Sequence, residues 1–140
     1  MRLEKLSNQF YGVNILYGKI DLTPKHSWSF YYVVNNTSDE EFIEKEALKT
    51  VLLANEFSRE FHFYGKQAQK WETSFDLADI TIRPNATEKE IALTMVYNDL
   101  EEFVDVLQEE ISARYFVPRD TYLIYDDENI YKQILSKLKF

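Results

Sequence analysis

One stretch of the sequence, residues 98–116, constrains the fold more than any other, because it has the two faces of an amphipathic helix. Its apolar side chains follow the i, i+3, i+4 spacing and form one stripe: Leu100, Phe103, Val104, Leu107, Ile111 and Tyr115. The opposite face is polar and carries Glu101, Glu102, Asp105, Gln108, Glu109 and Ser112. Asn98 is the expected N-cap, and Pro118 ends the helix because proline lacks the amide donor. This helix is therefore expected to supply both a part of the core and an acidic surface.

The composition is that of one globular domain. The chain has 140 residues, of which 45% are hydrophobic and 16% aromatic, enough for an ordinary core. It has no cysteine, which excludes disulfides, zinc–thiolate sites and thiol nucleophiles and suits a reducing compartment. No apolar run approaches the ~20 residues that cross a bilayer, and the first ten residues do not resemble a secretory signal. We expect a single domain over residues 1–140 that is soluble and cytoplasmic, with a composition typical of AT-rich bacterial or phage genomes.

The net charge of −8 comes mainly from three short stretches, residues 39–46, 99–110 and 126–128. Each lies at or near the start of a predicted helix, where the helix dipole favours carboxylates, so capping alone explains any one of them. The same charge would repel nucleic acid and anionic membranes and attract a basic partner over a Debye length of ~8 Å. We therefore expect a basic protein partner, and neither nucleic acid nor a membrane as a direct one.

The first third of the chain has the pattern of a β-hairpin. Residues 8–20 predict a strand with a bulge at Gly12, and residues 26–35 predict a second strand paired with it. The second strand alternates Trp28, Phe30, Tyr32 and Val34 with side chains that are hardly less apolar.

A long helix is expected to follow the hairpin. Ser38 and Glu41 have the spacing of a capping box, and apolar residues keep helical spacing from there to about residue 61. Gly65 is the expected stop at the C-terminal end of this helix.

The rest of the chain predicts a second hairpin, over residues 74–83 and 87–97, before the helix at 98–116. A rival interpretation joins 87–97 to that helix, but its β-branched content favours a strand. A short strand at 121–125 then precedes a last helix, capped by Asp126 or Asp127.

The predicted order is therefore β-β-α-β-β-α-β-α. It indicates an α+β fold of two layers, with a mainly antiparallel sheet and the helices on one side.

Known chemical motifs are absent from the sequence. The three glycines, Gly12, Gly18 and Gly65, cannot form a phosphate-binding loop, and there is no G-x-S-x-G, H-E-x-x-H or EF-hand pattern. No Asp or Glu stands two positions before a lysine, which removes the usual end of a restriction-type nuclease site. We expect no cofactor.

The two histidines are the candidates for proton transfer. His62, beside Glu60 in the segment REFHFYG, is the better one, and His26 could join it if folding brought them together. A histidine in the last turn of a helix is equally well explained by the helix dipole.

Clustered carboxylates raise the question of a metal. Asp126, Asp127 and Glu128 are consecutive, and Asp76 with Asp79 could join them. Consecutive residues at a helix cap point in different directions, so we expect capping and no metal site.

Aromatic residues are unusually frequent, with ten Tyr, ten Phe and two Trp. An aromatic core is one explanation, and exposed interface anchors are the other, for which Tyr97 and Trp71 are the candidates.

The hypothesis that these features favour is a small acidic binding protein that is not an enzyme. It would inhibit a basic nucleic-acid-handling enzyme, in the manner of an immunity protein or of a phage anti-defence protein of the anti-CRISPR type. Carboxylates would take the place of phosphates, and the residues expected to bind the partner are Glu101, Glu102, Asp105, Glu109, Tyr97 and Trp71. One alternative is an enzyme that uses His62 with Glu60 or His26. Another is a structural or adaptor subunit of a phage or bacterial assembly, which would self-associate as a homo-oligomer.

Overall fold

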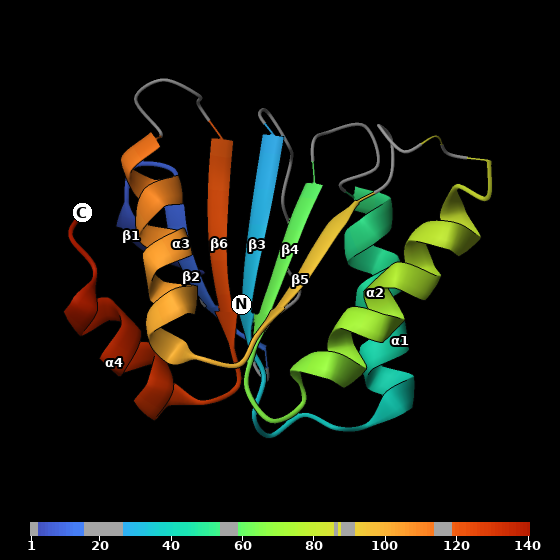
Figure 1. The fold of residues 1–140 in the computed structure, drawn as a ribbon, viewed down its shortest axis with the longest axis horizontal. Coiled ribbons are helices and arrows are strands. Elements are labelled where there is room, and N and C mark those ends of the chain that lie inside the picture. Colours follow the sequence, from blue (N-terminus) through green and yellow to red (C-terminus); the bar gives the residue numbers. More distant parts are fainter. Residues whose placement is uncertain (1–2, 16–26, 54–58, 86, 88–91, 114–118) are drawn as a thin grey trace.

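The computed structural model describes residues 3–15, 27–53, 59–85, 87, 92–113 and 119–140. In this part of the chain a six-stranded mixed sheet is combined with four helices, in the order β-β-β-α-β-α-β-α-β-α (Figure 1). The strands are β1 (Leu3–Ser7), β2 (Phe10–Asn14), β3 (Ser27–Val33), β4 (Arg59–Tyr64), β5 (Leu93–Tyr97) and β6 (Arg119–Tyr125). The helices are α1 (Glu40–Leu53), α2 (Ala68–Ile82), α3 (Leu100–Ala113) and α4 (Glu128–Lys137). None of the helices described is both long and apolar enough to cross a membrane.

The sheet is mostly parallel, so the prediction of a mainly antiparallel sheet is wrong. The strand order is β1-β2-β6-β3-β4-β5, and only β1 and β2 pair antiparallel. The expected hairpin between 8–20 and 26–35 does not form, because β6 lies between β2 and β3. The two apolar faces of the segment 26–35 are the signature of a parallel strand that is covered on both sides.

Helices cover both faces of the sheet, where the sequence predicted one. The first core joins the sheet to α1 and α2 through residues such as Phe30, Phe61 and Trp71. The second core joins the opposite face to α3 and α4 through residues such as Tyr31 and Phe103. The chain moves outward from β3 to β5 and then returns to insert β6 beside β3. Because crossovers between parallel strands are right-handed, this reversal places the later helices on the other face.

The predicted long helix beginning at Ser38 is also wrong in its last part. The described helix α1 covers Glu40–Leu53, and residues 59–64 form strand β4. In β4 the aromatic residues Phe61 and Phe63 face α1 and α2, while His62 faces the side of α3. The run FHFY is apolar enough to continue a helical stripe, but its alternation is that of a strand between two helical layers.

The segment 74–83 is helical, and the strand predicted there is wrong. It belongs to α2, whose buried residues Ala68, Trp71, Phe75 and Ala78 keep helical spacing. The strand expected in 87–97 is confirmed by β5, although residues 88–91 lie outside the described part. Of the helix predicted at 98–116, α3 confirms residues 100–113, and residues 114–116 lie outside the described part. The strand at 121–125 is confirmed by β6, and the last helix by α4.

The caps and glycines differ in detail from the prediction. The side chains that accept hydrogen bonds at the starts of α1 and α3 are Asp39 and Asp99, each one residue after the expected Ser38 and Asn98. Gly12 pairs regularly with β1, and its lack of a side chain makes room for a tyrosine ring of α4. Gly65 ends a strand and not a helix, with a φ of 123° that favours glycine.

The carboxylate of Asp126 holds the carboxyl ends of β3 and β6 together. It accepts hydrogen bonds from the backbone amides of Asn35, Asn36 and Thr37 at 2.8, 2.9 and 2.7 Å. Asp126 is only 7% exposed. The next residue, Asp127, caps α4 and accepts from the side chain of Asn35, and these hydrogen bonds lower the pKa of the Asp127 carboxyl group.

Replacing Asp126 tests this clamp. Asp126→Asn keeps the size of the side chain but turns one acceptor oxygen into a donor that faces backbone N–H groups. We expect the free energy of unfolding to fall by about 2–3 kcal/mol in urea denaturation. The control Asp105→Asn changes an exposed aspartate of α3 and should shift it by less than about 0.5 kcal/mol. Equal stability of Asp126→Asn and the unmodified protein would contradict this account.

Candidate functional site

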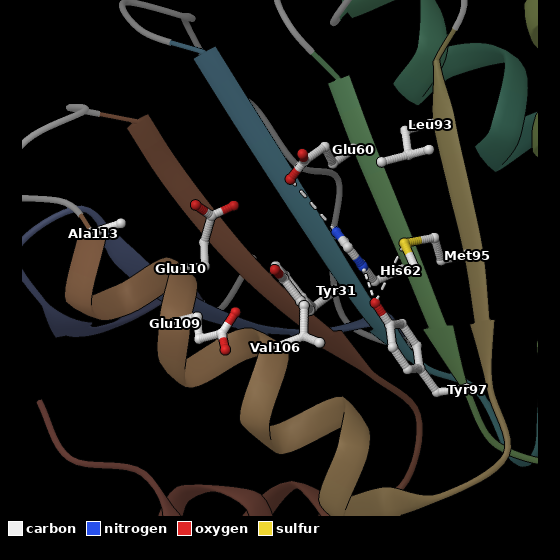
Figure 2. Close-up of a pocket in the computed structure, with 10 residues that line it drawn as sticks. All are labelled: Tyr31, Glu60, His62, Leu93, Met95, Tyr97, Val106, Glu109, Glu110 and Ala113. Carbon is white, nitrogen blue, oxygen red and sulfur yellow. Dashed lines mark hydrogen bonds and ion pairs between the residues drawn. The ribbon is translucent and has the colours of Figure 1, made fainter.

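A partly open pocket of about 370 Å³ lies between α3 and the face of the sheet formed by β3, β4 and β5 (Figure 2). We call it the His62 pocket. Its lining residues are Tyr31, Glu60, His62, Leu93, Met95, Tyr97, Val106, Glu109, Glu110 and Ala113. The first turn of α3 packs against β3, β4 and β5 through Phe103, whereas the rest of α3 and helix α4 lie toward β6 and β2, so this part of the sheet is only partly covered (Figure 1). As a result Leu93 is 50% exposed and Met95 40%.

The periodicities of the elements bring these side chains together. On a strand every second residue shares a face, which places Glu60 and His62 of β4 on the same side as the odd-numbered residues of β5. On α3 the spacing of three and four residues aligns Val106, Glu109 and Glu110 along the side that borders the pocket.

His62 lies at the base of the pocket and is only 3% exposed. Its ring is stacked on that of Tyr31, with centroids 4.2 Å apart and an interplanar angle of 3°. Its Nδ1 atom is 2.8 Å from the hydroxyl oxygen of Tyr97, and that hydroxyl is also 3.5 Å from the sulfur of Met95 (Figure 2). These contacts fix the orientation of the imidazole.

The hydrogen-bond chain indicates which ring nitrogen carries the hydrogen. The Tyr97 hydroxyl has one proton, and it can donate to Met95 while accepting from His62 only if Nδ1 of the histidine is protonated. The Nε2 atom is then an acceptor. Nε2 is buried without a hydrogen-bond partner, and the nearest carboxylate oxygen, of Glu60, is 3.6 Å away. Two acceptors therefore lie side by side at the base of the pocket.

Negative charge surrounds the pocket. Glu60, Glu109 and Glu110 contribute three carboxylates, and no Lys or Arg is found among the described lining residues. Burial, and then the charges of Glu102 and Glu60, raise the pKa of Tyr97 to about 12. The phenol of Tyr97 stays neutral at physiological pH, and its raised pKa reflects burial first and the nearby negative charge second.

The predicted site residues differ in how exposed they are in the structure. Glu101, Glu102 and Asp105 are exposed on α3, and Glu109 is both exposed and part of the His62 pocket. Tyr97 is nearly buried, with its hydroxyl toward the pocket. Trp71 is 0% exposed and donates its indole hydrogen to the carbonyl of Thr37, so as placed it cannot contact a partner. His26 lies outside the described residues.

The structure brings Glu60 and His62 together, as the enzyme alternative supposed, but not at the end of a helix. Both are on β4, two residues apart on one face of the strand. Leu93, Met95, Val106 and Glu110 were not predicted as site residues. The alternation of residues 93, 95 and 97 was visible, but the side from which α3 approaches β5 was not.

The carboxylates considered as metal ligands have other contacts. Asp126 and Asp127 bind backbone amides, as described above, and Asp79 binds Arg83 and the backbone amide of Ala92. Asp76 and Glu72 both contact the hydroxyl of Thr94, and the hydrogen bond with Asp76 raises the pKa of Glu72. In the described part of the chain no group of three or more His, Asp or Glu side chains could hold a metal ion.

Comparison with known proteins gives no match: no family model, no curated protein and no solved structure is significantly similar to the chain. Its function must therefore be argued from the site.

Removing the Tyr97 hydroxyl tests the arrangement around His62. In Tyr97→Phe the Nδ1–H group loses its acceptor, and we expect the free energy of unfolding to fall by about 1–2 kcal/mol. We also expect ¹⁵N NMR to show the His62 hydrogen moving from Nδ1 to Nε2. The control Tyr64→Phe, on the same strand, should leave both unchanged within about 0.5 kcal/mol. A ring whose Nε2 carries the hydrogen in the unmodified protein would contradict the proposed chain.

Proposed function

We propose that this protein is an acidic binding protein that docks onto a basic protein. The proposal is supported chiefly by one observation: the exposed carboxylates of α3 continue through Glu109 into the His62 pocket, which also exposes apolar side chains. We define the acidic docking surface as this pocket together with Glu101, Glu102 and Asp105. An apolar centre with a charged surround is the usual anatomy of a protein interface.

The charges of α3 are available to a partner. Glu101, Glu102, Asp105 and Glu109 form no ion pair within the described residues. Glu101, Glu102 and Asp105 lie within the first two turns of the helix, where the helix dipole stabilises carboxylates, so their presence there also has a structural explanation. The dipole does not explain Glu109 near the C-terminal end, where it disfavours negative charge. Glu109 is therefore the part of the acidic surface that capping leaves unexplained.

The partner we propose is a nucleic-acid-handling enzyme whose phosphate-binding surface is basic. Rows of carboxylates can occupy positions that phosphates otherwise take, and exclude the nucleic acid. The biological setting that suits such an inhibitor is an immunity protein or a phage anti-defence protein.

The electrostatic part of this proposal is tested by binding kinetics on a partner captured at low salt. Neutralising Glu101, Glu102, Asp105 and Glu109 to the corresponding amides should lower the association rate constant at least about tenfold and change the dissociation rate less. Raising the ionic strength from about 0.1 M to about 1 M shortens the Debye length from about 10 Å to about 3 Å and should have a similar effect.

The matched control neutralises Glu40, Glu41, Glu44 and Glu128, which are exposed elsewhere and carry the same total charge. It should bind almost normally, and a short DNA duplex should compete with the protein for the partner. Association that is insensitive to salt and to the α3 substitutions, or that DNA does not displace, would refute charge mimicry.

A second candidate function is an enzyme that transfers protons through His62, and the geometry around its Nε2 atom favours it. Tyr97 orients the ring through Nδ1, which leaves Nε2 directed at the carboxylate of Glu60. The described lining has no Ser, Thr or Cys, so this site would act by general acid–base catalysis rather than through those nucleophiles.

The second candidate is tested with activated esters and phosphodiesters as probe substrates. General-base catalysis predicts that His62→Gln lowers the hydrolysis rate about 10²–10⁴-fold, whereas Tyr64→Phe leaves it unchanged. Thermal unfolding of both variants controls for folding. A rate that is the same for the unmodified protein and His62→Gln would exclude this candidate for those substrates.

A further inference from the structure

The two edges of the sheet differ in how they are protected. Edge strands offer unpaired backbone groups to other chains, and proteins usually block them with charged side chains, prolines or bulges. Strand β1, at one edge, has Glu4 and Lys5 and a break in its register between Lys5 and Ser7. Strand β5, at the other edge, has the sequence LTMVY, without charge or proline, and pairs with β4 in unbroken register (Figure 1). Of the two edges, β5 is therefore the one suited to pairing with an added strand.

The outward backbone groups of β5 have no partner among the described residues. In a strand that pairs on one side, alternate residues direct their N–H and C=O groups at the neighbour, and the others direct theirs away. The carboxylate of Asp79 accepts a hydrogen bond from the amide of Ala92, just before the strand. For residues 93–97, the described part of the chain contains no backbone hydrogen bond beyond the ladder with β4. A strand from outside can therefore supply the missing donors and acceptors.

The side chains beside this edge indicate the chemistry of the added strand. On the face toward α3, Leu93 and Met95 are exposed, and Glu109 lies across the pocket from them (Figure 2). Glu109 is itself exposed and forms no ion pair among the described residues. Long basic side chains cover apolar surface with their aliphatic stems and keep the charged head in water. An extended segment with Lys or Arg on this face therefore matches both the apolar side chains and the carboxylate.

A second copy of the chain matches this edge less well. If two β5 strands paired antiparallel about a twofold axis, both α3 helices would lie on the same face of the joined sheet. The carboxylates of the two Glu109 residues would then approach each other across the new pair of strands, in two chains that each carry a net charge of −8. Like charges brought together in this way oppose association.

We propose that the outer edge of β5 is the site where an extended, basic segment of the partner protein pairs as an additional strand. The backbone of this segment takes up the outward N–H and C=O groups of residues 93–97. Its basic side chains on the α3 face lie over Leu93 and Met95, and their charges meet Glu109. This inference rests on the proposed function only for the origin of the segment, and it adds how that partner is held.

The test uses the whole protein and a peptide blocked at both ends, of about nine residues, long enough to span a strand. The peptide alternates arginine with valine, and amide hydrogen exchange measured by NMR reports pairing residue by residue. At saturation we expect exchange to slow at least about tenfold at alternate amides of residues 93–97 and to stay unchanged in β1, the opposite edge. The same peptide with N-methylated central residues keeps its side chains but lacks the donors, and should not bind.

Two pairs of variants test the side-chain part of the proposal. Leu93→Lys introduces at β5 the kind of charge that β1 already has, and should weaken peptide binding at least about tenfold. Its matched control, Leu77→Lys on α2, should bind normally, since the two leucines are similarly exposed, at 50% and 59%. Glu109→Gln should weaken binding about threefold, whereas Glu101→Gln, which is exposed on α3 away from the pocket lining, should not. Circular dichroism and thermal unfolding check the fold of all four variants.

Three results overturn the inference. The first is unchanged exchange in β5 at saturating peptide, and the second is equal binding of the N-methylated peptide. The third is protection of β5 that rises with protein concentration when no peptide is present, together with dimers in sedimentation, because a second copy would then occupy the edge.

The two proposals fail in different ways. A peptide that protects β5 while no basic protein binds would leave the edge site intact and refute the docking function. A basic partner that depends on the α3 carboxylates, but leaves the amides of β5 unprotected in the complex, would do the reverse.

Discussion

The carboxylate of Asp126 is the interaction on which the arrangement of this protein most depends. It joins the carboxyl end of β6 to that of β3 through three backbone amides, at the place where the strand order reverses. Doubly wound sheets usually leave a crevice for a ligand at this point, with backbone amides directed at an anionic group. Here a side-chain carboxylate of the same chain takes up those amides. The place where a phosphate-bearing ligand would be expected is therefore already filled by negative charge, and the candidate site lies at another part of the sheet.

That other part follows from the same reversal. Because the chain returns from β5 to place β6 beside β3, the last two helices lie mainly toward β2 and β6, and the strands β4 and β5 keep a partly open face beyond Phe103. An open face beside an edge strand invites pairing with another copy of the chain. The carboxylates of Glu60, Glu109 and Glu110 oppose this, because two copies that met through this surface would bring like charges together. In the proposed function the same charges would attract a basic protein, so the surface would be selective through its repulsion as well as its attraction.

The sequence predicted individual elements better than their arrangement, and the reason is physical. The helix at 98–116 and the capped last helix were identifiable because a one-sided stripe has a single interpretation. Strand β4 was not, since Phe61 also continues the helical spacing of the apolar residues before it, and only burial between two helical layers distinguishes residues 59–64 from the end of a helix. The acidic side of α3 was visible in the sequence, and Glu60 and His62 could be paired from their spacing. Their meeting with Met95 and Tyr97 depends on the pairing of β4 with β5, a long-range contact that no local pattern contains.

The aromatic residues show how this limit affects the functional argument. Their number was consistent with exposed anchors for a partner, yet most of those described stack in the two cores, as Phe30 does on Phe61 and Tyr122, and Trp71 is fully buried. A sheet that must be apolar on both faces needs large flat side chains on both, so the aromatic content is explained by the parallel architecture. The case for a partner then depends less on aromatic anchors than on the exposed Leu93 and Met95. These apolar side chains occur beside the exposed carboxylate of Glu109, so a partner that docks there would cover apolar surface and meet negative charge at the same place.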